Sequence, residues 1–150
     1  MIFSRPYLAV RLTPGTDVRE YLEKWCREEK IEAGVILTMV GSLQTASIRM
    51  AGKSEPRVME GPFEVVSCEG TLSADGIHVH LALSDSDGKV IGGHLSKGST
   101  VNTTIELVVL NLSDSWRFER NPDPVTGHKE LKCVPKFMPE PTGAEVLEGR

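Results

Sequence analysis

From residue 33 onward, apolar side chains alternate with polar ones along much of the chain, and this pattern limits the fold more than any other feature. A repeat of two residues is typical of β-strands with one buried and one exposed face. Gly41-Ser42 is expected to separate the first two strands, and 103–112, the most apolar segment, to lie centrally. The expected strands are 34–40, 43–50, 63–73, 77–83, 89–95, 103–112, "WRFER" and "ELKCVPKF".

The segment before residue 33 contains one convincing helix, which follows a first strand at "YLAVRL" (7–12). Asp17 can cap this helix, and Glu20 three residues later completes a pattern like a capping box. One helix beside many short strands favours an α+β fold, a mostly antiparallel β-sheet with one main α-helix packed against it. A single apolar stripe on the helix is expected to face the sheet: Val18, Leu22, Trp25 and Cys26.

The length of 150 residues fits a single domain with a core of its own. We expect that domain to span 1–136 and a loose tail to follow over 137–150, because "PEPTGAEVLEGR" is polar and rich in Pro and Gly. The net charge of −4 argues against non-specific binding of nucleic acid, which needs a basic surface.

Three cysteines, Cys26, Cys68 and Cys133, lie far apart and include no C-x-x-C pair. They predict reduced, mostly buried thiols rather than a disulfide framework or a Cys-rich zinc site. The N-terminus lacks the apolar core of a signal peptide, and no stretch approaches the ~20 apolar residues of a membrane span. We therefore expect a cytoplasmic protein with no membrane partner.

Three of the four histidines fall within "GIHVHLALSDSDGKVIGGHL", residues 76–95. His78 and His80 share a face if their segment is extended, because residues i and i+2 of a strand point the same way. If residues 86–88 alone form the turn, His80 lies opposite His94, and His78 is its diagonal neighbour. A four-residue turn would send His94 to the other face. The histidine cluster therefore depends on the length of the turn.

Three imidazoles on one face match the ligand set that zinc uses when one position stays open for water. His78, His80 and His94 are thus candidate ligands of a divalent metal, with zinc as the expected ion. Two other interpretations stay open: solvated or hydrogen-bonded histidines on a sheet face, and a metal-free acid/base or ligand site. No nucleophile, cofactor loop or acid/base pair accompanies the histidines, so catalytic residues stay unassigned.

Other polar residues are weaker candidates for a site. Ser42 lacks the G-x-S-x-G context of a hydrolase nucleophile. Glu106 lies in the most apolar segment and is either part of a structural ion pair or a site residue, since a buried carboxylate needs a partner. Arg5 and Arg49 could bind an anion, or simply lie at the surface. The carboxylates that could point inward are Glu64, Glu69 and Glu106.

The histidine segment and its flanks resemble the plants-and-prokaryotes conserved (PPC) domain, a family also described as a DNA-binding motif. The matching parts are G-x-F-E-[VI] at 61–65 and D-G-x-[VI]-x-G-G at 87–93, followed by the apolar strand. "GSLQTASIRM" and "FERNPDPVTGHKELK" extend the likeness to residues 5–135. The resemblance implies an α+β fold assembled as a homotrimer.

Stand-alone prokaryotic members of this family share H-x-H and G-G-H, which are His78, His80 and His94 here. The resemblance implies that these residues bind a divalent metal, zinc, or a small-molecule ligand. In plant members the domain follows an AT-hook that contacts DNA, and the domain itself mediates assembly and partner binding. Because "RGRP" is missing here, direct DNA binding is not expected. The alternative function is a regulatory or assembly module, DNA-binding or not, without catalysis.

Overall fold

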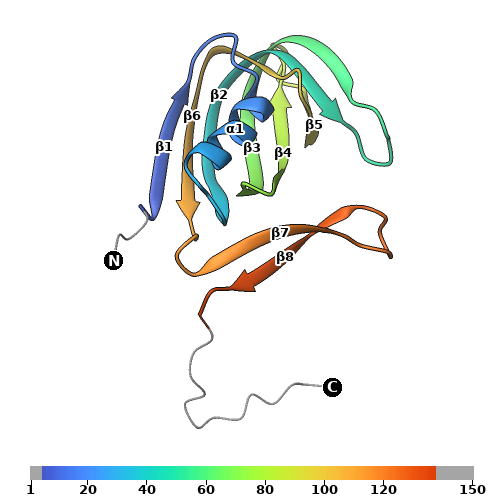
Figure 1. Ribbon diagram of the computed structural model, residues 1–150. Helices are drawn as coiled ribbons and strands as arrows, with labels where there is room; N and C mark the ends of the chain where they lie inside the picture. The colour runs from blue at the N-terminus through green and yellow to red at the C-terminus, as the bar shows by residue number, and fades with distance from the viewer. Residues whose placement is uncertain (1–4, 138–150) are drawn as a thin grey trace.

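The computed structural model describes residues 5–137, which form a mostly antiparallel β-sheet with one helix against it, as predicted (Figure 1). The tail predicted over 137–150 lies outside the described residues apart from its first position, and the domain limits of 1–136 stay a prediction. The elements are β1 Tyr7–Leu12, α1 Val18–Glu28, β2 Gly34–Arg49, β3 Arg57–Ser73, β4 Gly76–Ser84, β5 Val90–Leu95, β6 Thr100–Asn111, β7 Trp116–Pro122 and β8 Lys129–Pro135.

The helix α1 begins where its cap and its apolar stripe predict it. The Oδ1 atom of Asp17 accepts a hydrogen bond from the backbone N–H of Glu20 at 3.0 Å. This bond satisfies one of the free N–H groups at the start of a helix. All four residues of the predicted stripe are buried in the hydrophobic core: Val18, Leu22, Trp25 and Cys26.

Six strands form one sheet in the order β1-β6-β2-β3-β4-β5, and every neighbouring pair is antiparallel. The strand β2 also pairs with β5, through Ile48↔Leu95 and Arg49↔His94, so the sheet curls and closes on itself at this end. Figure 1 shows α1 lying across this sheet. The most apolar segment, now β6, is paired on both sides, by β1 and by β2.

The predicted break at Gly41-Ser42 is wrong, because β2 runs through these residues as one strand. Gly41 has a φ of +142°, and a Cβ built there would lie 2.0 Å from the carbonyl oxygen of Thr104 in β6. The register of β2 against β6 shifts just after this point. The glycine therefore marks a close approach of two backbones within the sheet and an irregularity in the pairing, rather than a turn.

The strands β7 and β8 form a separate two-stranded sheet that lies below the main sheet in Figure 1. The backbone N–H of Phe118 donates to the carbonyl of Glu32 at 2.8 Å, and the Phe118 side chain is buried. The backbone N–H of Arg120 donates to Oδ2 of Asp75 at 2.6 Å. These bonds fix the hairpin against the start of β2 and the β3–β4 turn.

No helix within residues 5–137 is long and apolar enough to cross a membrane.

The substitution Gly41→Ala is expected to lower the free energy of unfolding by more than about 2 kcal/mol, because the new Cβ would overlap the β6 backbone. Gly52→Ala is the matched control, since its φ is +71° but no atom lies within 4 Å of the new Cβ. That control should lose only about 1 kcal/mol of backbone strain. Denaturant titrations measure both losses, and equal losses would contradict the close approach.

Candidate metal centre

A three-residue turn sets the register of the β4–β5 hairpin. The N–H of Asp85 donates to the carbonyl of Lys89 at 2.9 Å, which leaves residues 86–88 as the turn. The Oδ1 atom of Asp85 accepts from the N–H groups of Asp87 and Lys89, both at 2.9 Å. His80 consequently lies opposite His94, so the register predicted for a three-residue turn is confirmed.

The three predicted histidines meet on one face of the sheet. The Nε2 atoms of His78 and His80 lie 3.1 Å apart. The ring centroid of His94 is 5.2 Å from that of His78 and 5.7 Å from that of His80. One ring nitrogen from each residue can be chosen so that all three lie within 4.8 Å of one another.

These distances suit a tetrahedral metal and also suit a direct hydrogen bond. Two imidazole nitrogens bound to one tetrahedral zinc ion lie about 3.3 Å apart, close to the 3.1 Å between His78 and His80. The nitrogen of His94 lies within 4.8 Å of the other two, so it would have to move closer to share one ion. Without a metal, a neutral imidazole can donate to its neighbour across 3.1 Å.

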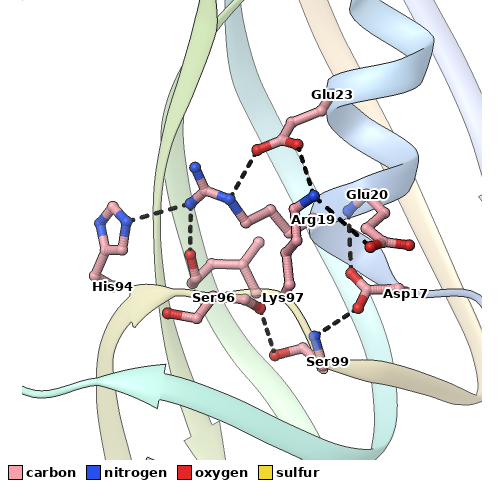
Figure 2. A network of polar contacts seen from close by, with 10 residues as sticks. Asp17, Arg19, Glu20, Glu23, His94, Ser96, Lys97 and Ser99 are labelled. Atoms are coloured by element: carbon pink, nitrogen blue, oxygen red, sulfur yellow. Dashed lines mark hydrogen bonds and ion pairs between the residues drawn. The ribbon is translucent and has the colours of Figure 1, made fainter. Parts of the chain in front are cut away.

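Arg19 of α1 contacts the third histidine, as Figure 2 shows. Its Nη1 atom lies 3.2 Å from Nε2 of His94 and also donates to the carbonyl of Leu95 at 2.7 Å. Its Nε atom pairs with Glu23 at 2.9 Å. A guanidinium only donates, so Nε2 of His94 accepts here. Arg19 therefore competes with a metal for this lone pair.

The other ring nitrogen of His94, Nδ1, is buried and has no hydrogen-bond partner among the described residues. A buried donor left unpaired costs about 1–3 kcal/mol. The imidazole of His94 is thus incompletely satisfied by the described residues, because its Nδ1–H has no acceptor.

Burial and nearby positive charge lower the pKa of His78 and of His94. Burial is the main cause that lowers the pKa of His94 to about 4, and the guanidinium groups of Arg49 and Arg19 lower it further. Burial also lowers the pKa of His78, with His80 and Arg120 as the next causes. Neutral imidazoles carry the free lone pairs that a metal needs, so these shifts favour metal binding near pH 7.

A cleft of about 550 Å³ opens beside the histidines. Its walls come from α1, the β3–β4 turn and the β7–β8 hairpin, together with His78 and His94. Sequence reasoning did not identify Arg19 and Arg120 as residues of these walls. Arg120 follows the buried Phe118 at i+2, which is the signal that could have placed its side chain toward the main sheet.

Two of the remaining sequence candidates, Glu69 and Arg49, are the register partners of His80 and His94. The expectation of inward carboxylates is wrong, because all three are exposed: Glu64, Glu69 and Glu106. Ser42 accepts a hydrogen bond from the backbone N–H of Thr103 at 3.0 Å, which is a structural contact between β2 and β6. Arg5 is exposed, whereas Arg49 lines the cleft.

Residues 4–113 match the family described as the Plants and Prokaryotes Conserved (PCC) domain. A bifunctional protein GlmU of Synechococcus sp. is 39% identical over 139 residues, 91% of this chain and 22% of the relative. AT-hook motif nuclear-localized protein 14 of Arabidopsis thaliana is 27% identical over 108 residues, 67% of this chain and 26% of the relative. The chain thus spans about a fifth to a quarter of the curated relatives that it matches.

Three solved structures share the fold. A hypothetical protein from Salmonella enterica is 37% identical with a TM-score of 0.83, covering 87% of this chain and 94% of that chain. A metal-containing protein from Archaeoglobus fulgidus is 29% identical with a TM-score of 0.70, covering 88% and 96%. A plant- and prokaryote-conserved protein from Pyrococcus horikoshii is 24% identical with a TM-score of 0.68, covering 88% and 97%.

The low pKa of His94 is expected to make the stability of metal-free protein depend on pH. An unfolded histidine has a pKa near 6.5, against about 4 for His94 in the folded chain. The unfolded chain therefore binds the extra proton, and the stability that is complete above pH 6.5 is lost progressively toward pH 4. Denaturant midpoints measured in EDTA should fall less steeply over this range for His94→Gln than for the parent. Parallel curves for the two proteins would contradict this assignment.

Proposed function

We propose a function from the premise that this chain belongs to the Plants and Prokaryotes Conserved (PCC) domain family. The chain binds one divalent metal ion, zinc, through the imidazoles of His78, His80 and His94. The observation that carries this proposal is the meeting of three ring nitrogens within 4.8 Å on one sheet face. Three imidazoles with an open fourth position are a ligand set that zinc uses.

The surroundings of the histidines support the same proposal. The depressed pKa values of His78 and His94 favour unprotonated imidazoles, the form that binds a metal. The adjoining cleft leaves room for a ligand beside the imidazoles. A zinc ion in such a site supplies a Lewis acid with a position for water or a ligand atom. A structural neighbour from Archaeoglobus fulgidus is described as a metal-containing protein. We assign binding to the site and no reaction.

The proposal includes assembly into a homotrimer, which the family resemblance implies. Two valines on the outer face of the sheet support a protein interface. Val40 and Val66 are 52% and 55% exposed, and they directly adjoin Gly41 and Val65, which are paired across β2 and β3. Exposed apolar side chains that lie together mark interaction surfaces more often than isolated ones.

The cysteines support a reducing compartment, the cytoplasm. Cys26 and Cys68 are free and buried, and burial raises the pKa of each thiol to about 12. Cys133 is free and exposed. An exposed thiol persists in a reducing environment, where disulfides are rare.

A DNA-binding or purely regulatory role is the second candidate, and the similarity to the Arabidopsis AT-hook protein is the observation in its favour. That similarity covers 67% of this chain at 27% identity. Binding through phosphates would weaken steeply as salt is raised. Salt-dependent binding of duplex DNA by a metal-free, histidine-substituted chain would favour this role over the proposed one.

Elemental analysis of purified protein is expected to find about one zinc ion per chain. His94→Ala should weaken zinc binding by more than the ~10–100-fold that loss of an outer-shell partner costs, because a direct ligand is lost. His128→Ala is the matched control, since His128 lies outside the group of three. Zinc content should be unchanged in the control. Absence of zinc from the parent after incubation with the ion would overturn the proposal.

Light scattering is expected to give a mass about three times the 16.4 kDa of one chain. Val40→Glu should shift the mass toward one chain, because a charge would enter an apolar interface. Val125→Glu makes the same change in the β7–β8 turn, at a side chain that is 92% exposed, and should leave the mass unaltered. A parent mass of one chain would contradict the homotrimer.

A further inference from the structure

The cleft beside the histidines is lined by more positive than negative side chains. Five basic residues stand against three acidic ones, an excess of two positive charges in a chain whose net charge is −4. The basic residues are Arg19, Arg27, Arg49, Arg120 and Lys129, and the acidic ones are Glu23, Asp75 and Glu130. A concave surface with an excess of one sign of charge attracts ligands of the opposite sign.

Three of these arginines, Arg27, Arg49 and Arg120, have no ion-pair partner within residues 5–137. Arg49 donates to the carbonyl of Lys53 at 3.3 Å, and Arg120 donates from Nη2 to the hydroxyl of Thr71 at 2.6 Å. The Nε atom of Arg120 is buried and has no hydrogen-bond partner in this part of the chain. A buried charged donor without a partner is costly, so its environment is incomplete.

Arg120 is held beside the histidines although it comes from the separate β7–β8 sheet. Its backbone N–H donates to Asp75, and its stem passes Gly76, where an added Cβ would lie 3.2 Å from Arg120 Cγ. Thr71, which accepts from its guanidinium, is the register partner of His78. The positive charge of Arg120 therefore lies next to this imidazole.

Arg49 lies on the opposite side of the same row. It is the register partner of His94 across β2 and β5, and His94 is the partner of His80 across β5 and β4. Residues paired directly across antiparallel strands point to the same face. The three imidazoles thus lie between two guanidinium groups that form no ion pair within residues 5–137. Carboxylates are nearby: Asp75 and Glu130 act on Arg120, and Glu69 is the register partner of His80.

We propose that the cleft is a binding site for the oxyanion group of a small molecule, a carboxylate or a phosphate, with Arg120 and Arg49 as its donors. A guanidinium presents paired N–H groups that match two oxygens of such a group. The cleft volume of about 550 Å³ lies in the range of small-molecule sites. This site goes beyond the proposed metal site, since the arginines bind the anion whether or not a metal is present.

The test is calorimetric titration of the EDTA-treated full chain with inorganic phosphate and with malonate, at constant ionic strength set by chloride. Saturable binding of either anion is the expected result. Arg120→Gln and Arg49→Gln should each weaken it by about 10-fold or more, because a charge-assisted hydrogen bond is lost. Binding of phosphate alone or malonate alone identifies which oxyanion the site prefers.

Arg117→Gln is the matched control. Arg117 lies on the same strand as Arg120, pairs with Glu119 at 2.8 Å and is absent from the cleft walls. Its variant changes the net charge equally and should bind the anion like the parent. Arg120→Lys keeps the charge and should bind between the parent and Arg120→Gln, which covers the case in which the glutamine variant fails to fold.

The proposal is overturned if neither anion binds saturably, or if Arg117→Gln weakens binding as much as Arg120→Gln does. The metal proposal is measured separately, since these titrations are made without metal. If the chain binds an anion but takes up no zinc, the anion site is supported and the metal site is contradicted. If the chain takes up zinc but binds no anion, the metal site is supported and the anion site is contradicted.

Discussion

The register between β4 and β5 is the constraint on which both the site and the closure of the sheet depend. A shift by one residue would turn every side chain of β5 to the opposite face. Leu95 is fully buried and pairs with Ile48, so a shifted strand would expose Leu95 and bury the imidazole of His94. The hydrophobic core therefore enforces the same register that the Asp85 hydrogen bonds select in the turn.

Electrostatics links the histidines to the arginines around them. Each guanidinium favours the neutral form of a nearby imidazole, since two positive charges in a partly buried place repel. Neutral imidazoles are competent to bind a metal, yet the same guanidiniums repel that metal, and Arg19 occupies a lone pair of His94. An anion in the cleft would weaken the repulsion of the guanidinium groups toward a protonated imidazole and toward a metal. Metal and anion would then each raise the affinity of the chain for the other, as linkage requires.

Local signals were sufficient to predict much of this arrangement. The alternation of side chains places His78 and His80 on one face, and the Asp17 cap marks the start of α1, because each signal acts over a few residues. The face of His94 stayed open in the sequence, since it depends on whether the turn has three or four residues. Gly41 was misread because a turn and a close backbone approach require the same residue. The carboxylates were misread because alternation gives no information about which face is covered. The spacing from Phe118 indicates which face of β7 carries Arg120, but its place in the cleft depends on docking of β7–β8 against the main sheet, which no local pattern encodes.

The origin of the cleft walls has a mechanical consequence. One wall belongs to the curled six-stranded sheet and α1, which share a continuous core, and another belongs to the two-stranded β7–β8 sheet. A two-stranded hairpin has little stability of its own in water. Local opening of the hairpin therefore requires less free energy than global unfolding does. The width of the cleft is consequently expected to fluctuate, whereas the spacing of the imidazoles is held by the core of the main sheet.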